Sequence, residues 1–354
     1  MGCTDGILPV HVGHSQLGLD AGDRYHRPME ERLLARGRLR VTRFGLGLAA
    51  LGRPGYLNVG HGDDVAGATD VRAMERRAHE LLDAAYAAGI RYVDAARSYG
   101  HAERFLAAWL RARGIGPDSV TVGTKWGYEY TAGWRVRAER HEVKDHSLAT
   151  LRRQWGDTDA LLHGRVDLLQ VHSATLDSGI LDDREVHAEL ARLRADGRVR
   201  ALGLTLSGPG QAATLARAME LRDGSAPLFD TVQATWNPLE PSAGEALARA
   251  HAAGMGVIVK EALANGRLIR GSEATPLAAH AARLRTTTDA LGLAHAIAQP
   301  WADIVLLGPT TLEQLRANLA ALDVRPDAAA TQTLELMAQP APVYWEARAA
   351  MPWS

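Results

Sequence analysis

Short apolar runs and longer amphipathic segments alternate along the chain from about Arg40 to Leu322. In the first amphipathic segment the apolar positions follow the 3.6-residue period of a helix, at Met74, Ala78, Leu81, Leu82 and Ala85. Gly89 follows this segment and suits the left-handed residue that ends a helix. The apolar runs are almost continuous, which is typical of strands that are buried on both faces. The alternation therefore predicts a parallel sheet covered by helices.

Eight such apolar runs predict strands, at residues 43–48, 90–94, 120–125, 166–171, 199–204, 229–235, 256–260 and 303–307. Eight parallel strands are the number that closes a (β/α)8 TIM barrel, whereas a doubly wound sheet rarely needs so many regular units. We therefore predict a single barrel domain over residues 41–325, with an N-terminal extension (1–40) and a C-terminal tail (326–354). Within the extension we expect disorder up to residue 24 and a hairpin around Gly37 that caps the barrel floor.

The charge and cysteine content of the chain limit its expected binding partners and its expected location in the cell. Lys and Arg (40) nearly balance Asp and Glu (41), so the chain has no overall electrostatic attraction to nucleic acid or an anionic membrane. Cys3 is the single cysteine, and the N-terminus lacks the apolar stretch of a signal peptide. The apolar stretch 290–308 is too interrupted by polar residues to span a bilayer. We expect a cytoplasmic protein with a small-molecule substrate and leave its oligomeric state open.

Four polar residues lie at or just after the ends of three neighbouring predicted strands: Asp94, Tyr99, Lys125 and His172. Adjacent strands lie about 4.8 Å apart, so these side chains are expected at one corner of the barrel mouth. A carbonyl that accepts hydride needs a proton at its oxygen, and tyrosine is a weak acid with a pKa near 10. A nearby lysine lowers that pKa, a carboxylate keeps the lysine charged, and a histidine orients the substrate. The group predicts carbonyl reduction.

Several motifs resemble the aldo-keto reductase family, and together they run from about Phe44 to Leu322. They are Gly45-Leu46-Gly47, Tyr92-Val93-Asp94, Ser98-Tyr99-Gly100 with Glu103, Thr124-Lys125, Leu169-Gln170-Val171-His172, Gln233, and Gly308 with Gln314 and Asn318. The resemblance implies that Tyr99 is the acid/base, that Asp94 and Lys125 tune it, and that His172 orients the substrate.

The resemblance also implies a nicotinamide cofactor, NADPH or NADH. The cofactor residues are expected at Gly47, Thr205, Gln233, Lys260, Leu263, Gly308, Thr310, Gln314 and Asn318. Leu206 departs from the family's Ser-Asn pair, and Ser207 could compensate for it. The stretch Gly308–Gln314 has no cation for a 2′-phosphate before Arg316, although Thr310 or Thr311 can cap a helix N-terminus that binds an anion.

Aromatic residues at the strand ends are candidates for the substrate pocket. We place Trp126 and Trp236 there, with packing in the core as the alternative. We assign no metal, because the histidines and acids of the loops, His11, His14, His61, Asp63 and Asp64, lie away from strand ends and are expected in solvent. The glycines near Gly45 do not have the spacing of a Rossmann motif.

The sequence thus predicts an NAD(P)-dependent oxidoreductase that acts on an aldehyde, ketone or sugar carbonyl, or on the corresponding alcohol. Two other classes of protein remain open. One is a regulatory subunit that binds the cofactor on the same fold without turnover, and the other is a non-redox barrel enzyme of a biosynthetic pathway.

Overall fold

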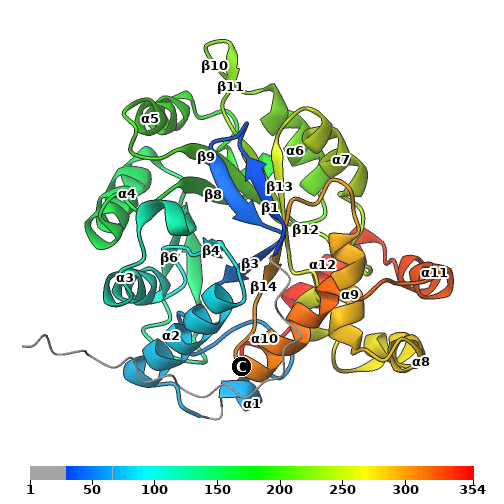
Figure 1. The fold of residues 1–354 in the computed structure, drawn as a ribbon. Helices are drawn as coiled ribbons and strands as arrows, with labels where there is room; N and C mark the ends of the chain where they lie inside the picture. The colour runs from blue at the N-terminus through cyan, green and yellow to red at the C-terminus, as the bar shows by residue number, and fades with distance from the viewer. Residues whose placement is uncertain (1–28, 66) are drawn as a thin grey trace, which may run out of the picture.

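Eight parallel strands form a closed barrel in the computed structural model, which describes residues 29–65 and 67–354. The strands are hydrogen-bonded in the order β12-β13-β14-β3-β4-β5-β8-β9, and helices surround them (Figure 1). They are β3 (Phe44–Gly47), β4 (Tyr92–Asp94), β5 (Thr121–Trp126), β8 (Leu168–Ala174), β9 (Ala201–Leu206), β12 (Thr231–Thr235), β13 (Gly256–Lys260) and β14 (Ile304–Leu307). The predicted (β/α)8 barrel is confirmed.

Most of the surrounding helices bury an apolar face in the core around the strands, whereas Leu277 of the helix Thr275–Arg283 belongs to a separate cluster with residues of the C-terminal tail. The surrounding helices are α2 (Val71–Ala87), α3 (Ala102–Ala112), α4 (Leu148–Leu162), α5 (Arg184–Ala195), α6 (Gln211–Glu220), α7 (Gly244–Ala252), α8 (Thr275–Arg283), α9 (Thr288–Ile297) and α10 (Leu312–Leu319). The sequence analysis assigned no helix to the segment that forms α4. Polar Thr150, Gln154 and Thr158 lie on its buried face beside Leu151 and Trp155, so its apolar periodicity is weak.

The antiparallel strands β1 (Glu31–Leu34) and β2 (Leu39–Thr42) form a hairpin that covers the N-terminal end of the barrel. Three successive turn residues have positive φ, Ala35 (+51°), Arg36 (+56°) and Gly37 (+87°), and the glycine adopts this conformation without steric cost. The hairpin packs its apolar side chains, among them Leu34, Leu39 and Val41, against inward residues of the barrel strands near their N-terminal ends. Cys3, His11 and His14 lie outside the described residues.

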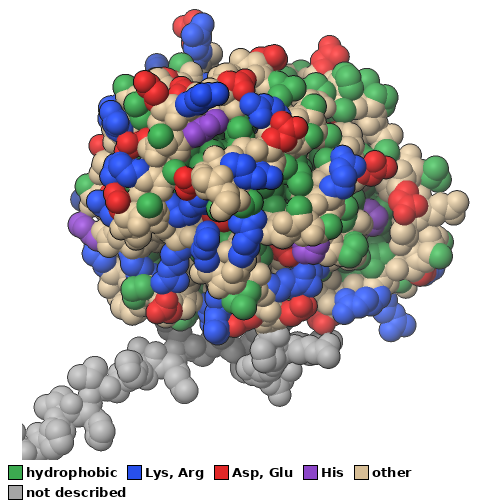
Figure 2. Space-filling model, turned by 90° about the horizontal axis from the view of Figure 1, so that it is seen from above, with side chains coloured by type: hydrophobic (Ala, Val, Ile, Leu, Met, Phe, Trp, Pro, Cys, Tyr) green, Lys and Arg blue, Asp and Glu red, His purple; other side chains and the backbone are tan. Residues whose placement is uncertain are grey.

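Further short helices and strands lie in the loops and in the C-terminal tail. They are α1 (His61–Val65), β6 (Tyr128–Tyr130), β7 (Glu142–Lys144), β10 (Arg222–Asp223), β11 (Ala226–Pro227), α11 (Ala328–Leu336), α12 (Ala341–Ala349), and the 3-10 helices η1 (Pro117–Ser119), η2 (Leu176–Ser178), η3 (Ala264–Gly266), η4 (Ser272–Ala274) and η5 (Ala320–Leu322). Over the described part of the chain, none of the helices has the length and hydropathy needed to cross a bilayer. Figure 2 shows both signs of charge interspersed over one face, in keeping with the nearly balanced composition.

The C-terminal residues return to the mouth of the barrel beside α1 (Figure 1). The backbone N–H of Tyr56 donates to the carbonyl of Ser354 at 3.0 Å, and the N–H of Ser354 donates to the carbonyl of Tyr56 at 3.2 Å. The ring of Trp353 stacks on His141, with the ring centroids 3.9 Å apart. The tail is therefore packed against the loops that build the mouth.

The hairpin generates a stability prediction. Leu39 has no exposed surface, whereas Leu33 of the same hairpin is 67% exposed. We expect Leu39→Ala to lower the free energy of unfolding by about 2–5 kcal/mol, because it leaves a cavity in the barrel floor. Leu33→Ala is the matched control and should change it by less than about 0.5 kcal/mol. Urea unfolding followed by circular dichroism measures both, and equal effects would contradict the packing described for the floor.

Candidate active site

A buried carboxylate lies inside the barrel, just below its mouth. Asp94, at the end of β4, is 2% exposed and forms an ion pair with the ammonium of Lys125 on β5. Its other oxygen, Oδ1, accepts hydrogen bonds of 3.1 Å each from the hydroxyl of Tyr92 and the amides of Gln170 and Gln233. A buried charge is tolerated where a counter-ion and several donors satisfy it. This network fixes both Asp94 and Lys125.

Two glycines make room for the ring of Tyr92 inside the barrel. A Cβ atom at Gly45 would lie 2.6 Å from the Tyr92 ring, and one at Gly123 would lie 2.3 Å from its hydroxyl. Both distances are far below van der Waals contact, so a larger residue at either position would displace Tyr92. These glycines therefore allow the tyrosine hydroxyl to reach Asp94.

Tyr99 and His172 lie above this network and line one cavity together. Their rings meet edge to face with centroids 5.5 Å apart. The ammonium of Lys125 lies 4.8 Å from the centre of the Tyr99 ring, and the guanidinium of Arg53 lies 5.1 Å from it. The structure thus brings Asp94, Tyr99, Lys125 and His172 to one corner of the mouth.

The pKa of Tyr99 is raised overall in this structure, whereas the sequence led us to expect a lowered value. Burial raises the pKa of Tyr99 well above its usual value, the Asp94 carboxylate raises it further, and Arg53 opposes both. Tyr99 is therefore protonated at neutral pH and can donate a proton.

His172 is a neutral ring. Burial lowers its pKa well below the usual value, and the nearby cations Lys125, Lys260 and Arg53 lower it further. Its Nδ1 atom lies 3.5 Å from the hydroxyl oxygen of Ser98. β8 continues past His172 to Ala174 with an irregular register, and Ser173 has a φ of +52°. Such an irregularity redirects side chains at a barrel rim.

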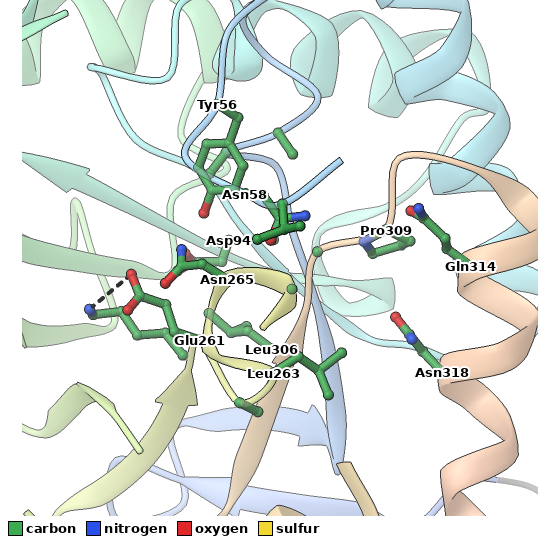
Figure 3. A pocket seen from close by; sticks show the side chains of 18 of the residues that line it. Tyr56, Asn58, Asp94, Glu261, Leu263, Asn265, Leu306, Pro309, Gln314 and Asn318 are labelled. Atoms are coloured by element: carbon green, nitrogen blue, oxygen red, sulfur yellow. Dashed lines mark ion pairs between the residues drawn. The ribbon is translucent and has the colours of Figure 1, made fainter. Parts of the chain in front are cut away.

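The cavity has a volume of about 550 Å³ and extends from Tyr99 to the first turns of α10. Gln314 and Asn318 project from α10 at one end, whereas Glu261 and Asn265 lie at the other (Figure 3). The predicted site residues that line it are Gly47, Asp94, Tyr99, His172, Gln233, Lys260, Leu263, Gly308, Gln314 and Asn318. Lys125 does not line the cavity itself but forms an ion pair with Asp94, which does.

Two of the predicted cofactor residues do not line the cavity. The hydroxyl of Thr205 is buried and accepts a hydrogen bond from the backbone N–H of Ser173 at 2.7 Å, whereas Ser207 lines the cavity. Thr310 is also buried, and its N–H and hydroxyl donate to the side-chain oxygen of Gln314 at 2.8 and 3.0 Å. Thr311, which lines the cavity, accepts from the N–H of Gln314 and caps α10.

The placement of Trp126 and Trp236 in the substrate pocket was wrong. Successive residues of a strand point to opposite faces, so Trp126 points away from the barrel interior that Lys125 occupies, and its ring meets His146 with centroids 5.8 Å apart. Trp236 packs between His295 and Trp301 in the core, 5.4 and 5.3 Å from their ring centres. Neither tryptophan lines the cavity.

Charged pairs that the sequence analysis missed form much of the lining instead. Arg53, which is buried, forms an ion pair of 2.6 Å with Glu142. Arg348 of α12 forms hydrogen bonds of 2.5–3.1 Å with both oxygens of Glu261. Tyr128 also lines the cavity. No local signal could have linked Arg348 to Glu261, because 87 residues separate them.

Strained backbone accompanies this lining. Glu261, Ala264 and Asn265 all have a φ between +48° and +55°, a conformation that costs residues other than glycine about 1–3 kcal/mol each. Asn265 donates to the carbonyl of Leu57 at 2.9 Å, whereas its side-chain oxygen is buried without a hydrogen-bond partner. Strain and an unsatisfied acceptor at a cavity wall are typical of a ligand-binding site.

The expectation that His61 and Asp64 lie in solvent was wrong for both residues. His61 is fully buried, and burial lowers its pKa to about 4. Asp64 lines the cavity, whereas Asp63 is exposed. Within residues 29–65 and 67–354, no three histidine, cysteine or acidic side chains are grouped in a way that could hold a metal ion.

The barrel with Asp94, Tyr99, Lys125 and His172 at its mouth is the arrangement expected of a barrel oxidoreductase. Comparison with known proteins shows which family the chain belongs to. The model of the aldo/keto reductase family matches residues 60–336, so the chain belongs to that family. It is 29% identical over 229 residues to aldo-keto reductase ausK of Emericella nidulans, across 60% of this chain and 52% of that protein.

Two further comparisons agree with this assignment. The chain is 30% identical over 209 residues to pyridoxal 4-dehydrogenase of Microbacterium luteolum, across 49% of this chain and 55% of that protein. It thus spans about half the length of the curated relatives it matches. The holo form of an aldo-keto reductase from Bacillus halodurans superimposes with a TM-score of 0.65 at 22% identity, covering 88% of this chain and 97% of that one, which shows the shared fold.

The site generates a prediction about pH. Lys260 donates to the hydroxyl of Thr235 at 2.7 Å, and burial lowers its pKa from 10.5 to about 8 while Glu261 opposes the shift. The unfolded chain therefore binds more protons than the folded one between pH 8 and 10.5, so this group adds stability as the pH rises.

We expect the free energy of unfolding of the native protein to rise by about 2 kcal/mol, relative to Lys260→Met, between about pH 7 and about pH 9.5. Urea unfolding at several pH values measures the difference. A difference that does not change with pH would show that Lys260 titrates normally.

Proposed function

We propose that this protein is an NAD(P)H-dependent oxidoreductase that transfers hydride between nicotinamide and an aldehyde, ketone or sugar carbonyl, or the corresponding alcohol. The observation that carries the proposal is the pairing of a protonated Tyr99 with a neutral His172 in one cavity, directly above the Asp94–Lys125 pair. We propose a small-molecule substrate and a cytoplasmic location.

Tyr99 is the general acid of the proposed reaction. Its phenol donates a proton to the carbonyl oxygen as negative charge develops there. The resulting phenolate is stabilised by the ammonium of Lys125, held in place by Asp94, and by the guanidinium of Arg53. Neutral His172 can donate one N–H to the same oxygen and orient it. In the oxidative direction the proton returns to Tyr99.

The chemistry of the cavity suits a dinucleotide cofactor, which supplies the hydride when it is bound. A volume of about 550 Å³ lies within the range of about 300–1,000 Å³ that is usual for cofactor sites. The N-terminus of α10, capped by Thr311, offers free N–H groups to an anion. Gln314, Asn318 and the unsatisfied oxygen of Asn265 offer further hydrogen bonds. We propose these residues, with Gly47, Gln233, Lys260, Leu263 and Gly308, as the holders of NADPH or NADH.

The substrate end favours a small polar carbonyl compound. Arg53 with Glu142, and Glu261 with Arg348, present paired donors and acceptors beside Tyr128 and Tyr99. The remaining donor and acceptor sites of these pairs can bind the hydroxyls of a sugar, whereas an apolar aldehyde would displace water from them without replacing its hydrogen bonds, at a cost of about 1–3 kcal/mol for each site. Among the proposed substrates, hydroxylated ones are therefore preferred.

We expect Tyr99→Phe to lower kcat for carbonyl reduction by about a hundredfold to ten-thousandfold, because it removes the hydroxyl group that donates the proton. The Kd of the cofactor should change by less than about threefold, since the ring remains in place. Cofactor absorbance with a panel of sugars, aldehydes and ketones measures turnover, and quenching of tryptophan fluorescence measures Kd.

The matched control is Tyr130→Phe, which alters a tyrosine of the adjacent β6 strand that does not line the cavity, and it should turn over normally. Retained turnover in Tyr99→Phe would exclude Tyr99 as the acid. Tight cofactor binding without turnover by the native protein would instead favour the regulatory-subunit reading. A lack of both binding and turnover would favour a non-redox barrel enzyme.

A further inference from the structure

Asp64 brings a carboxylate into the α10 end of the cavity. It lies on the short helix α1, in the loop after β3, and its side chain is 11% exposed. Its Oδ2 atom accepts a hydrogen bond of 2.7 Å from the amide of Gln314 and lies 3.5 Å from the hydroxyl of Thr310. Its Oδ1 atom lies 3.2 Å from the guanidinium of Arg270.

The position of this carboxylate is fixed by its neighbours. The side-chain oxygen of Gln314 accepts from the N–H and hydroxyl of Thr310, and its NH₂ group donates to Asp64. The amide of Gln314 is therefore oriented at both ends. The network ties α1 to α10 and, through Arg270, to the loop between η3 and η4. Asp64 thus forms a fixed part of the cavity wall at the α10 end.

The charges at this end of the cavity are unfavourable for an additional phosphate. Asp64 and Glu313 both line it. Among the described residues that line the cavity, the cations Arg53, Lys260 and Arg348 lie at the end that holds Tyr99. Arg270 lies at the α10 end, where it forms an ion pair with Asp64. Arg316, the first cation after Gly308, is exposed and does not line the cavity.

We infer that Asp64 makes the site selective for NADH over NADPH. The inference rests on the proposed function, and it places the adenosine half of the cofactor along α10, where Gln314 and Asn318 line the cavity. A carboxylate accepts hydrogen bonds from the hydroxyls of an adenosine ribose, whereas it repels a 2′-phosphate, and acidic residues have this role in other dinucleotide sites. A phosphate beside Asp64 would also have to compete with it for Arg270.

The test is to measure Kd for NADH and for NADPH by isothermal titration calorimetry on the full chain. We expect the native protein to bind NADH at least about tenfold more tightly than NADPH. We expect Asp64→Asn to reduce this ratio by at least about tenfold, mainly through tighter binding of NADPH, since the amide removes the repulsion and releases Arg270.

Asp63→Asn is the matched control, because it makes the same change of charge one residue away on the same helix, at an exposed side chain outside the cavity. It should leave the ratio within about twofold of the native value. The double variant Asp64→Asn with Arg270→Met should lose most of the gained affinity for NADPH, because the released guanidinium is the group that would bind the phosphate.

A native protein that binds both cofactors equally well, or NADPH more tightly, would overturn the inference while leaving the proposed function intact. The same holds if Asp64→Asn leaves the ratio unchanged or if Asp63→Asn shifts it equally. Failure of the native protein to bind either cofactor would overturn the proposed function and this inference with it.

Discussion

The buried carboxylate of Asp94 is the group on which the rest of the site depends. Its partners come from four strands: Tyr92 from β4, Lys125 from β5, Gln170 from β8 and Gln233 from β12. Loss of a partner would leave a charge or a polar group unsatisfied in the barrel interior, which costs several kcal/mol. The network therefore fixes the side chains around half of the barrel, and it holds the lysine below Tyr99 without leaving a free charge there.

The loops and the tail supply the charged side chains that surround the mouth of the barrel. Arg53, Glu142, Glu261 and Arg348 come from four separate segments and meet as two ion pairs around the mouth. The backbone of Ser354 pairs with the loop that carries Tyr56, so the C-terminus helps to hold this wall. The barrel strands thus hold Asp94 and Lys125, whereas the irregular segments set the polarity of the cavity and the charge at its α10 end. This division between a rigid scaffold and variable loops is usual for barrel enzymes.

The barrel and the grouping of Asp94, Tyr99, Lys125 and His172 could be predicted from the sequence because both follow from local patterns. Apolar strands alternate with amphipathic helices, and strands that are consecutive in the barrel sequence lie side by side. Asp94 ends β4, and Lys125 is the last residue but one of β5, so the two side chains are neighbours. The predictions from the sequence failed where a side chain's position depends on the direction in which it points or on contacts between distant segments. Trp126 points outward because it follows an inward lysine, and the pairing of Arg348 with Glu261 needs the path of the tail. The pKa of Tyr99 depends on burial, which no spacing of residues reveals.

The central claim is that this cavity transfers hydride directly between a nicotinamide and a carbonyl carbon, with Tyr99 as the proton donor. The most direct test is to incubate the native protein with a hydroxylated aldehyde or ketone and NADH or NADPH that carries deuterium at the transferred position, and to analyse the alcohol by mass spectrometry. The account predicts an alcohol with one deuterium on the former carbonyl carbon, in normal water. An alcohol that gains this deuterium only when the reaction is run in heavy water, or the absence of any reduced product, would contradict it.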